Sequence, residues 1–219
     1  MFAPPLIAQA EPLTGPPVVA PDLAGVTELV RWAANAPLRG RWSPERVAAG
    51  YCARSPAEIL AEGTLPWTAP CADLSSLVAL GLVQAGLAPT LVLTGIRRPL
   101  RPVKFQCGLE LELEGRTHVI GFGLSCAWFY PGRFVETAHR PWIARRPLVE
   151  RDPERSFLSW FEPEGRAGLA ARFPGYELGR DLAVHQRQGA SLARYWLARW
   201  KSRRAPRPGR VAGAGGRWA

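Results

Sequence analysis

Long apolar runs are missing from this sequence, since none of its hydrophobic stretches approaches the roughly 18 residues that a membrane-spanning helix needs. The proline-rich lead-in, residues 1–21, has neither a basic start nor an unbroken apolar stretch, unlike a secretory signal peptide. We therefore expect a cytoplasmic protein with no membrane partner.

Sequence motifs for metals and nucleotides are also absent. The chain has no P-loop, no G-x-G-x-x-G motif and no C-x-x-C pair, so we expect no cofactor and no metal. Its four cysteines are widely spaced and, without a secretion signal, we expect them to be reduced. Cys107 and Cys126 are typical of buried core residues.

Lysine is scarce, because Lys104 and Lys201 are the only two. The formal charge of +10 therefore comes almost entirely from arginine. Such a bias indicates either polyanion binding or a coding preference for Arg, Ala, Gly and Pro. The Gly-, Pro- and Arg-rich segment 203–219 is typical of a disordered basic tail, which is the candidate nucleic-acid-binding part of the chain.

The remaining pattern predicts an α+β fold. Apolar spacing and capping residues predict helices over 21–36, 43–53 and 55–63, and most strongly over 71–85, where a buried helix stops at Gly86. A strand follows over 90–96, and a hairpin turns at Glu114-Gly115. After Pro131 the pattern becomes helical again, through segments 152–162, 164–173 and 189–204. We expect one α+β domain over 22–150 and a helical extension over 151–202.

Cys71 opens the strongest predicted helix, where the helix dipole favours thiolate over thiol by about 0.3–1 kcal/mol. Asp73 lies in the same turn, and its charge would raise the thiol pKa unless it points away. A catalytic thiol also needs a base. His118 follows on the second hairpin strand, in the order of a papain-type site, whereas His139 and His185 are typical of a loop and a solvated helix.

The segment "PCADLSSLVALGLVQAGLAPTLVLTGIRRP" followed by "FQCGLELELEGR" resembles the transglutaminase-like superfamily, and most closely its lasso-peptide leader peptidases. The shared features are a cysteine opening a helix, Ser75 four residues later, the stop at Gly86, and a strand from Phe105 that ends in Glu-Gly. The resemblance covers residues 65–123. It implies a papain-like fold, in which a Cys-bearing helix packs on a small antiparallel sheet, and a cysteine hydrolase acting on a peptide or protein, with Cys71 as nucleophile.

The sequence departs from that family at the histidine. The family strand carries His-Ala-Trp-Val-Glu, and counting from Phe105 places its histidine on Gly108 and its tryptophan on Glu110, so that only Glu112 is kept. A looser spacing places the histidine on Gln106, and the usual aspartate falls near Gly121.

Two explanations stay open. In the first, His118 has replaced the family histidine, with Glu110 or Glu112 orienting it. Pairing across a two-residue turn sets His118 opposite Leu111, on the apolar face, so this needs a bulge or a longer loop. In the second, the chain has lost hydrolysis and binds a peptide, or a polyanion through its Arg-rich C-terminal part. Independently of these explanations, Glu110, Glu112 and Glu114 form an acidic ladder on one strand face, which indicates a solvated edge, contact with a cationic peptide, or contact with the chain's own arginines.

Overall fold

A computed structural model describes residues 13–36, 46, 53–65, 71–98, 101–122 and 127–148, and the structural statements below concern these residues. The expected extension at 151–202, the tail at 203–219, His185, Cys52 and Cys126 lie outside them. Among the described helices, none has the length and apolar character required to cross a membrane.

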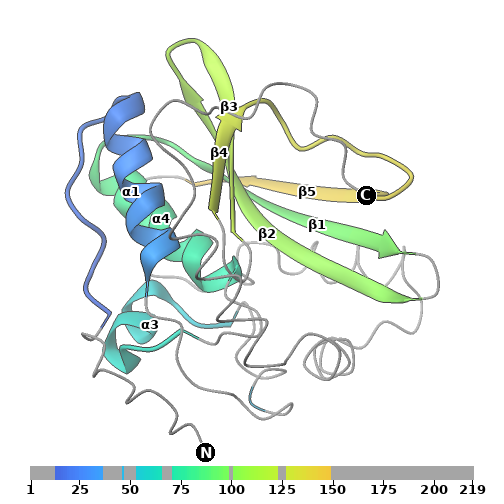
Figure 1. Ribbon diagram of the computed structural model, residues 1–219, viewed down its shortest axis with the longest axis horizontal. Coiled ribbons are helices and arrows are strands. Elements are labelled where there is room, and N and C mark those ends of the chain that lie inside the picture. The colour runs from blue at the N-terminus through green and yellow to red at the C-terminus, as the bar shows by residue number, and fades with distance from the viewer. Residues whose placement is uncertain are drawn as a thin grey trace, which may run out of the picture.

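The described residues form three helices and one antiparallel sheet of five strands, so the expected α+β class is confirmed (Figure 1). The sheet has the order β4-β3-β2-β1-β5, and α4 packs on β2 and β3 while α1 packs on α4 and β4. The elements are α1 (Leu23–Asn35), α3 (Pro56–Glu62), α4 (Cys71–Gln84), β1 (Thr90–Arg98), β2 (Arg101–Leu113), β3 (Arg116–Phe122), β4 (Ala127–Pro131) and β5 (Trp142–Pro147).

Capping residues set the ends of the two shorter helices. The Asp22 side chain accepts a hydrogen bond from the Gly25 N–H at 2.8 Å and begins α1. Ser55 and Glu58 form a capping box that begins α3, and Gly63 ends it with a φ of 66°. The predicted start at Ser55 and stop at Gly63 are therefore confirmed.

Helix α4 is the buried centre of the fold. Ten of its 14 residues are buried, because α1, α3 and the sheet cover different sides of it. Gly86 ends the helix with a φ of 77°, and the Leu87 N–H donates to the Leu82 carbonyl at 2.9 Å, which closes the last turn. The predicted buried helix and its stop at Gly86 are confirmed.

The β2–β3 hairpin has the predicted two-residue turn. Glu114 and Gly115 both have positive φ, at 52° and 72°, as a type I′ turn requires. The register then pairs Leu111 with His118, as predicted, and the described hairpin has no bulge to rotate the histidine.

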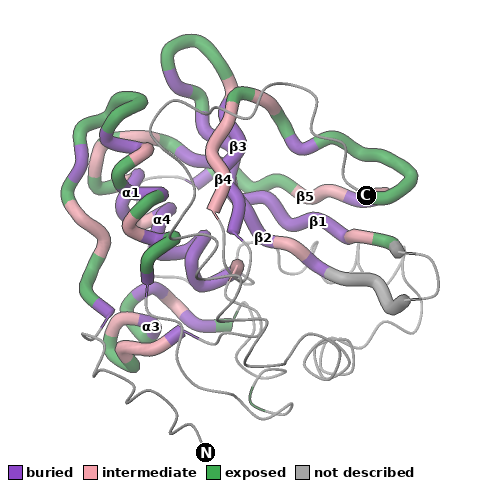
Figure 2. The backbone as a smooth tube through the Cα atoms, viewed as in Figure 1, coloured by how far each residue is buried: buried purple, intermediate pink, exposed green. Residues whose placement is uncertain are grey.

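The sheet separates two cores. Figure 2 shows that buried residues make up most of α4 and of the central strands. Cys107, Leu109 and Leu111 of β2 face α4 in the larger core, whereas Val92, Val119 and Phe134 form a smaller core on the outer face. Phe134 belongs to the β4–β5 connection, which therefore covers the outer face. The sequence pattern did not predict β5, which the chain adds as an edge strand beside β1. The helical segments predicted from residue 152 onward lie outside the described residues.

Candidate functional site

Cys71 is the first residue of α4, and its side chain is partly exposed and packed against the larger core. The backbone N–H groups of a helix's first turn have no intrahelical partner, so this end carries a partial positive charge. Ser75 lies one turn later on the same side of the helix. It is fully buried, and its Oγ has no hydrogen-bond partner among the described residues.

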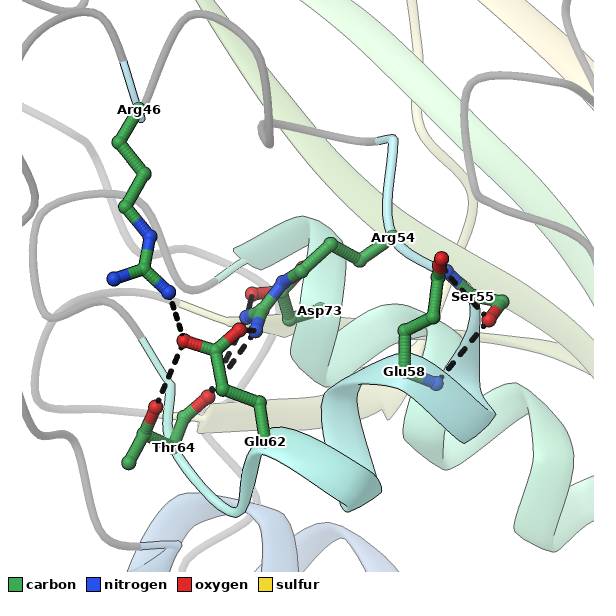
Figure 3. Close-up of polar contacts among 7 residues, drawn as sticks. All are labelled: Arg46, Arg54, Ser55, Glu58, Glu62, Thr64 and Asp73. Atoms are coloured by element: carbon green, nitrogen blue, oxygen red, sulfur yellow. Dashed lines mark hydrogen bonds and ion pairs between the residues drawn. The ribbon is translucent and has the colours of Figure 1, made fainter.

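Asp73, in the first turn of α4, is buried and accepts a hydrogen bond from Arg54 Nη2. Arg54 also donates from Nη1 to Glu62 Oε2 at 2.7 Å and, more weakly, to the Thr64 carbonyl at 3.4 Å. Arg46 Nη2 donates to the other oxygen of Glu62. Figure 3 shows Arg54 between the two carboxylates, joining the end of α3 to the start of α4.

Burial raises the pKa of the Asp73 carboxyl to about 6, while the nearby Arg54 opposes that rise. The charge that Asp73 carries is compensated by Arg54. The sequence-based objection that Asp73 would disfavour a Cys71 thiolate is therefore weaker than expected. Sequence reasoning missed Arg54, although a buried aspartate within an apolar helix signals that a cationic partner is needed.

His118 is buried on the α4-facing side of β3. Its Nδ1 lies 3.1 Å from the Arg116 carbonyl, and its ring centroid lies 5.2 Å from that of Phe129. An Nδ1–H that donates to this carbonyl leaves Nε2 as the acceptor nitrogen, which is the tautomer a general base needs. These two contacts hold the ring beside the β2–β3 turn.

The path of the chain relates His118 to the C-terminal end of α4, whereas Cys71 opens the helix. The chain leaves α4 at Gly86 and enters β1 at Thr90, whose partner Glu110 is the neighbour of Leu111. A short connection therefore leads from the C-terminal end of α4 to the strand position next to the Leu111–His118 pair. Cys71 is at the other end of this helix, which has 14 residues and is about 20 Å long. The catalytic pairing of Cys71 with His118 stays a prediction, and this arrangement weighs against it.

Glu112, the candidate orienting residue, is exposed on the opposite face of the hairpin from His118. It accepts hydrogen bonds from Thr117 Oγ1 and, at 3.0 Å, from Arg133 Nη2. Its pKa is lowered chiefly by the Thr117 bond, and by Arg133 and the nearby His118. His118 therefore contributes to the lowered pKa of Glu112, but the hydrogen bonds of the Glu112 carboxylate come from Thr117 and Arg133.

Glu110 is buried, so the expectation of a solvated edge is wrong for this residue. Arg145 Nε and Nη2 each donate to its carboxylate at 3.0 Å, and the Phe134 N–H donates at 2.8 Å. These bonds fasten β5 and the β4–β5 connection to the outer face. Glu110 and Glu112 thus contact the chain's own arginines, which is one of the alternatives that the sequence left open for the acidic strand.

The family histidine positions lie on the outer face of β2, away from α4. A Cβ added at Gly108 would come within 2.8 Å of both the Ile120 carbonyl oxygen and Phe134 Cζ, so no larger side chain fits without displacing its neighbours. Gln106 shares that face by alternation along the strand. A Cβ at Gly121 would meet Trp128 at 2.2 Å, so the usual aspartate position is closed too.

Neither a metal site nor a relative identifies the function. In the described part of the chain, no three His, Cys, Asp or Glu residues gather to hold a metal ion. His139 is exposed in the β4–β5 connection, and its carbonyl accepts from the Arg97 N–H at 2.9 Å.

No family model matches the chain, and comparison with curated proteins and with solved structures finds no match.

Proposed function

We propose that this protein is a transglutaminase-like cysteine hydrolase that cleaves a peptide or amide bond, with Cys71 as the nucleophile. The observation that supports this most is the environment of Cys71. The thiol opens a 14-residue helix packed on an antiparallel sheet, and the acidic residue of the same turn is buried against Arg54. The helix terminus then favours the thiolate without an uncompensated negative charge beside it.

The chemistry follows from that position. The Cys71 thiolate attacks the substrate carbonyl carbon, and a base that has taken the thiol proton returns it to the departing amine. Water then hydrolyses the thioester and regenerates the thiol. Backbone N–H groups of the first turn of α4 are suited to donate to the oxyanion. His118, through Nε2, is the candidate base in the described residues that lies on the α4-facing side of the sheet.

The test measures how fast each cysteine reacts with iodoacetamide at neutral pH, read by mass spectrometry of the digested protein. We expect Cys71 to react fastest, and a Cys71→Ala variant to lose both rapid labelling and cleavage of a peptide library. Cys107→Ala is the matched control, because Cys107 is fully buried on β2. Labelling of Cys71 no faster than that of Cys52 and Cys126 would contradict the proposal.

A second function, peptide binding without hydrolysis, is favoured by the closed space at Gly108 and by the position of His118. It predicts that the unaltered protein retains peptides from the library but forms no acyl-enzyme. Accumulation of an acyl-enzyme at Cys71, seen as a mass increase, would exclude this alternative. Loss of cleavage in His118→Gln together with slower labelling of Cys71, in a protein that still protects the buried Cys107, would assign His118 as the base.

Nucleic-acid binding by segment 203–219 stays a separate prediction, because that segment lies outside the described residues. Binding through phosphate contacts must weaken steeply as salt rises. Deleting 203–219 should abolish any such binding, and unchanged affinity of the deletion variant for DNA or RNA at low salt would rule it out.

A further inference from the structure

Arg140, in the β4–β5 connection, is an arginine without an acidic partner on the outer face of the sheet. The two buried or exposed acids of β2 on this face have arginines of their own. Arg145 donates two N–H groups to Glu110 at 3.0 Å, and Arg133 donates to Glu112 at 3.0 Å. In the described part of the chain, no carboxylate forms an ion pair with Arg140. Its positive charge is therefore left without a counter-charge.

Arg140 also differs from an arginine surrounded by water. Its guanidinium carbon lies 5.4 Å from the centre of the Phe134 ring, and its Nε is buried without a hydrogen-bond partner. Burial lowers the pKa of this guanidinium from its ordinary value, whereas Arg116 and Arg146 are exposed. A charged donor that has lost water and gained no partner costs free energy, and in native proteins it indicates a bound ion, ligand or water.

Tyr130 places a second donor near Arg140. It belongs to β4, lies opposite Val119 and packs, half-buried, against the smaller core that contains Phe134. Its hydroxyl makes no hydrogen bond with any described residue. Tyr130 is close enough to Arg140 to oppose, through its charge, the fall in the arginine pKa. A guanidinium and a phenol hydroxyl, both without protein partners, thus lie near each other beside Phe134.

This pair of donors matches an oxyanion. The guanidinium N–H groups form a planar fork that fits two oxygens of a carboxylate or a phosphate, and a phenol hydroxyl donates to one oxygen more. The Phe134 ring supports the guanidinium through a cation–π contact, so Arg140 loses less freedom when an anion binds. The nearby Glu110 carboxylate repels an anion little, because Arg145 neutralises it.

We propose that Arg140 and Tyr130 form a binding site for an oxyanion, the phosphate or carboxylate group of a small ligand, on the outer face of the sheet. The helix α4, which carries Cys71, packs on the other face. The proposal therefore does not rest on the proposed hydrolase, and either can fail without the other.

The test is calorimetric titration of the full chain with phenyl phosphate and with benzoate, two probes that share an aromatic ring and differ in their anionic group. About 0.15 M NaCl screens attraction by distant charges. We expect saturable binding at one site per chain, and the tighter probe shows whether the site prefers phosphate or carboxylate. Arg140→Met should weaken that binding at least about tenfold, and Tyr130→Phe about threefold to tenfold.

The matched control is Arg146→Met, which removes one exposed positive charge from the helix-facing side of β5. Its affinity should equal that of the unaltered protein. Equal weakening in Arg140→Met and Arg146→Met would mean attraction by overall charge and would overturn the proposal. So would the lack of saturable binding by both probes.

Urea denaturation shows whether each variant is folded and gives a second measure of binding. The tighter probe should raise the urea midpoint of the unaltered protein but not that of Arg140→Met. If Arg140→Met does not fold, Tyr130→Phe decides alone, because it removes one hydroxyl and keeps the ring that packs on the smaller core. Unchanged affinity in that variant then overturns the proposal.

Discussion

Two buried carboxylates on opposite sides of the sheet are stabilised very differently. Glu110, on the outer face, accepts three N–H donors from Arg145 and Phe134, and its partner Arg145 is 40% exposed. Asp73, beneath α3, accepts from Arg54, which is itself almost buried and shared with Glu62. Glu110 is therefore held by a nearly complete set of donors, whereas Asp73 depends on one side chain. The difference marks the Cys71 end of α4 as the electrostatically sensitive part of the fold.

Replacing Arg54 and Arg145, each in its own variant, should give the largest difference between the two buried pairs in lost unfolding free energy. Arg54→Met leaves Asp73 buried without its cation, which costs about 3–5 kcal/mol of unfolding free energy. Arg145→Met should cost less, because Glu110 keeps the Phe134 N–H and the lost cation is partly solvated. Urea denaturation at pH 7 measures both, and equal losses would break the comparison.

The pH dependence of stability should come next in size. The folded-state pKa of Asp73 is raised to about 6 from a reference of 3.8, so the folded state binds more protons than the unfolded state between these values. Stability from this group is present below about pH 4 and is lost as pH rises through 6, by roughly 3 kcal/mol at most. Urea midpoints from pH 4 to 7 should fall relative to those of Asp73→Asn. Parallel profiles for the two proteins would contradict this.

Gly108→Ala should act on the Glu110 side alone. The added Cβ meets the Ile120 carbonyl and Phe134, so Phe134 must shift and the hydrogen bond from its N–H to Glu110 weakens. We expect a loss of about 1–3 kcal/mol. The rate at which iodoacetamide labels Cys71 at neutral pH should be unchanged, since Gly108 faces away from α4. A changed rate would show that the two sides of the sheet are coupled.

Ser75→Ala should have the smallest effect on stability, near zero or slightly stabilising, because the fully buried hydroxyl makes no hydrogen bond in the described residues. If the hydroxyl instead serves the Cys71 site one turn away, alkylation slows while the urea midpoint is kept. A clear loss of stability would mean that Ser75 has a structural partner outside the described residues.

Local elements were predictable because short-range physics sets them. Gly63, Gly86 and the Glu114-Gly115 turn lie where the chain needs left-handed backbone, and the turn fixes the pairing of His118 with Leu111. The short strand β5 was missed because its half-buried edge position leaves no clear alternation of apolar and polar residues. The partners Arg54 and Arg145 were missed because they lie 19 and 35 residues from the acids they hold.

By itself the sequence determined the α+β class, the buried helix opened by Cys71, and the face of the hairpin on which His118 lies. These follow from spacing, capping and turn geometry, which act over a few residues. The tertiary structure alone decided which charge neutralises Asp73 and that the Glu110 carboxylate is buried against Phe134 and Arg145. Those outcomes depend on how distant segments pack, and no local pattern encodes that packing.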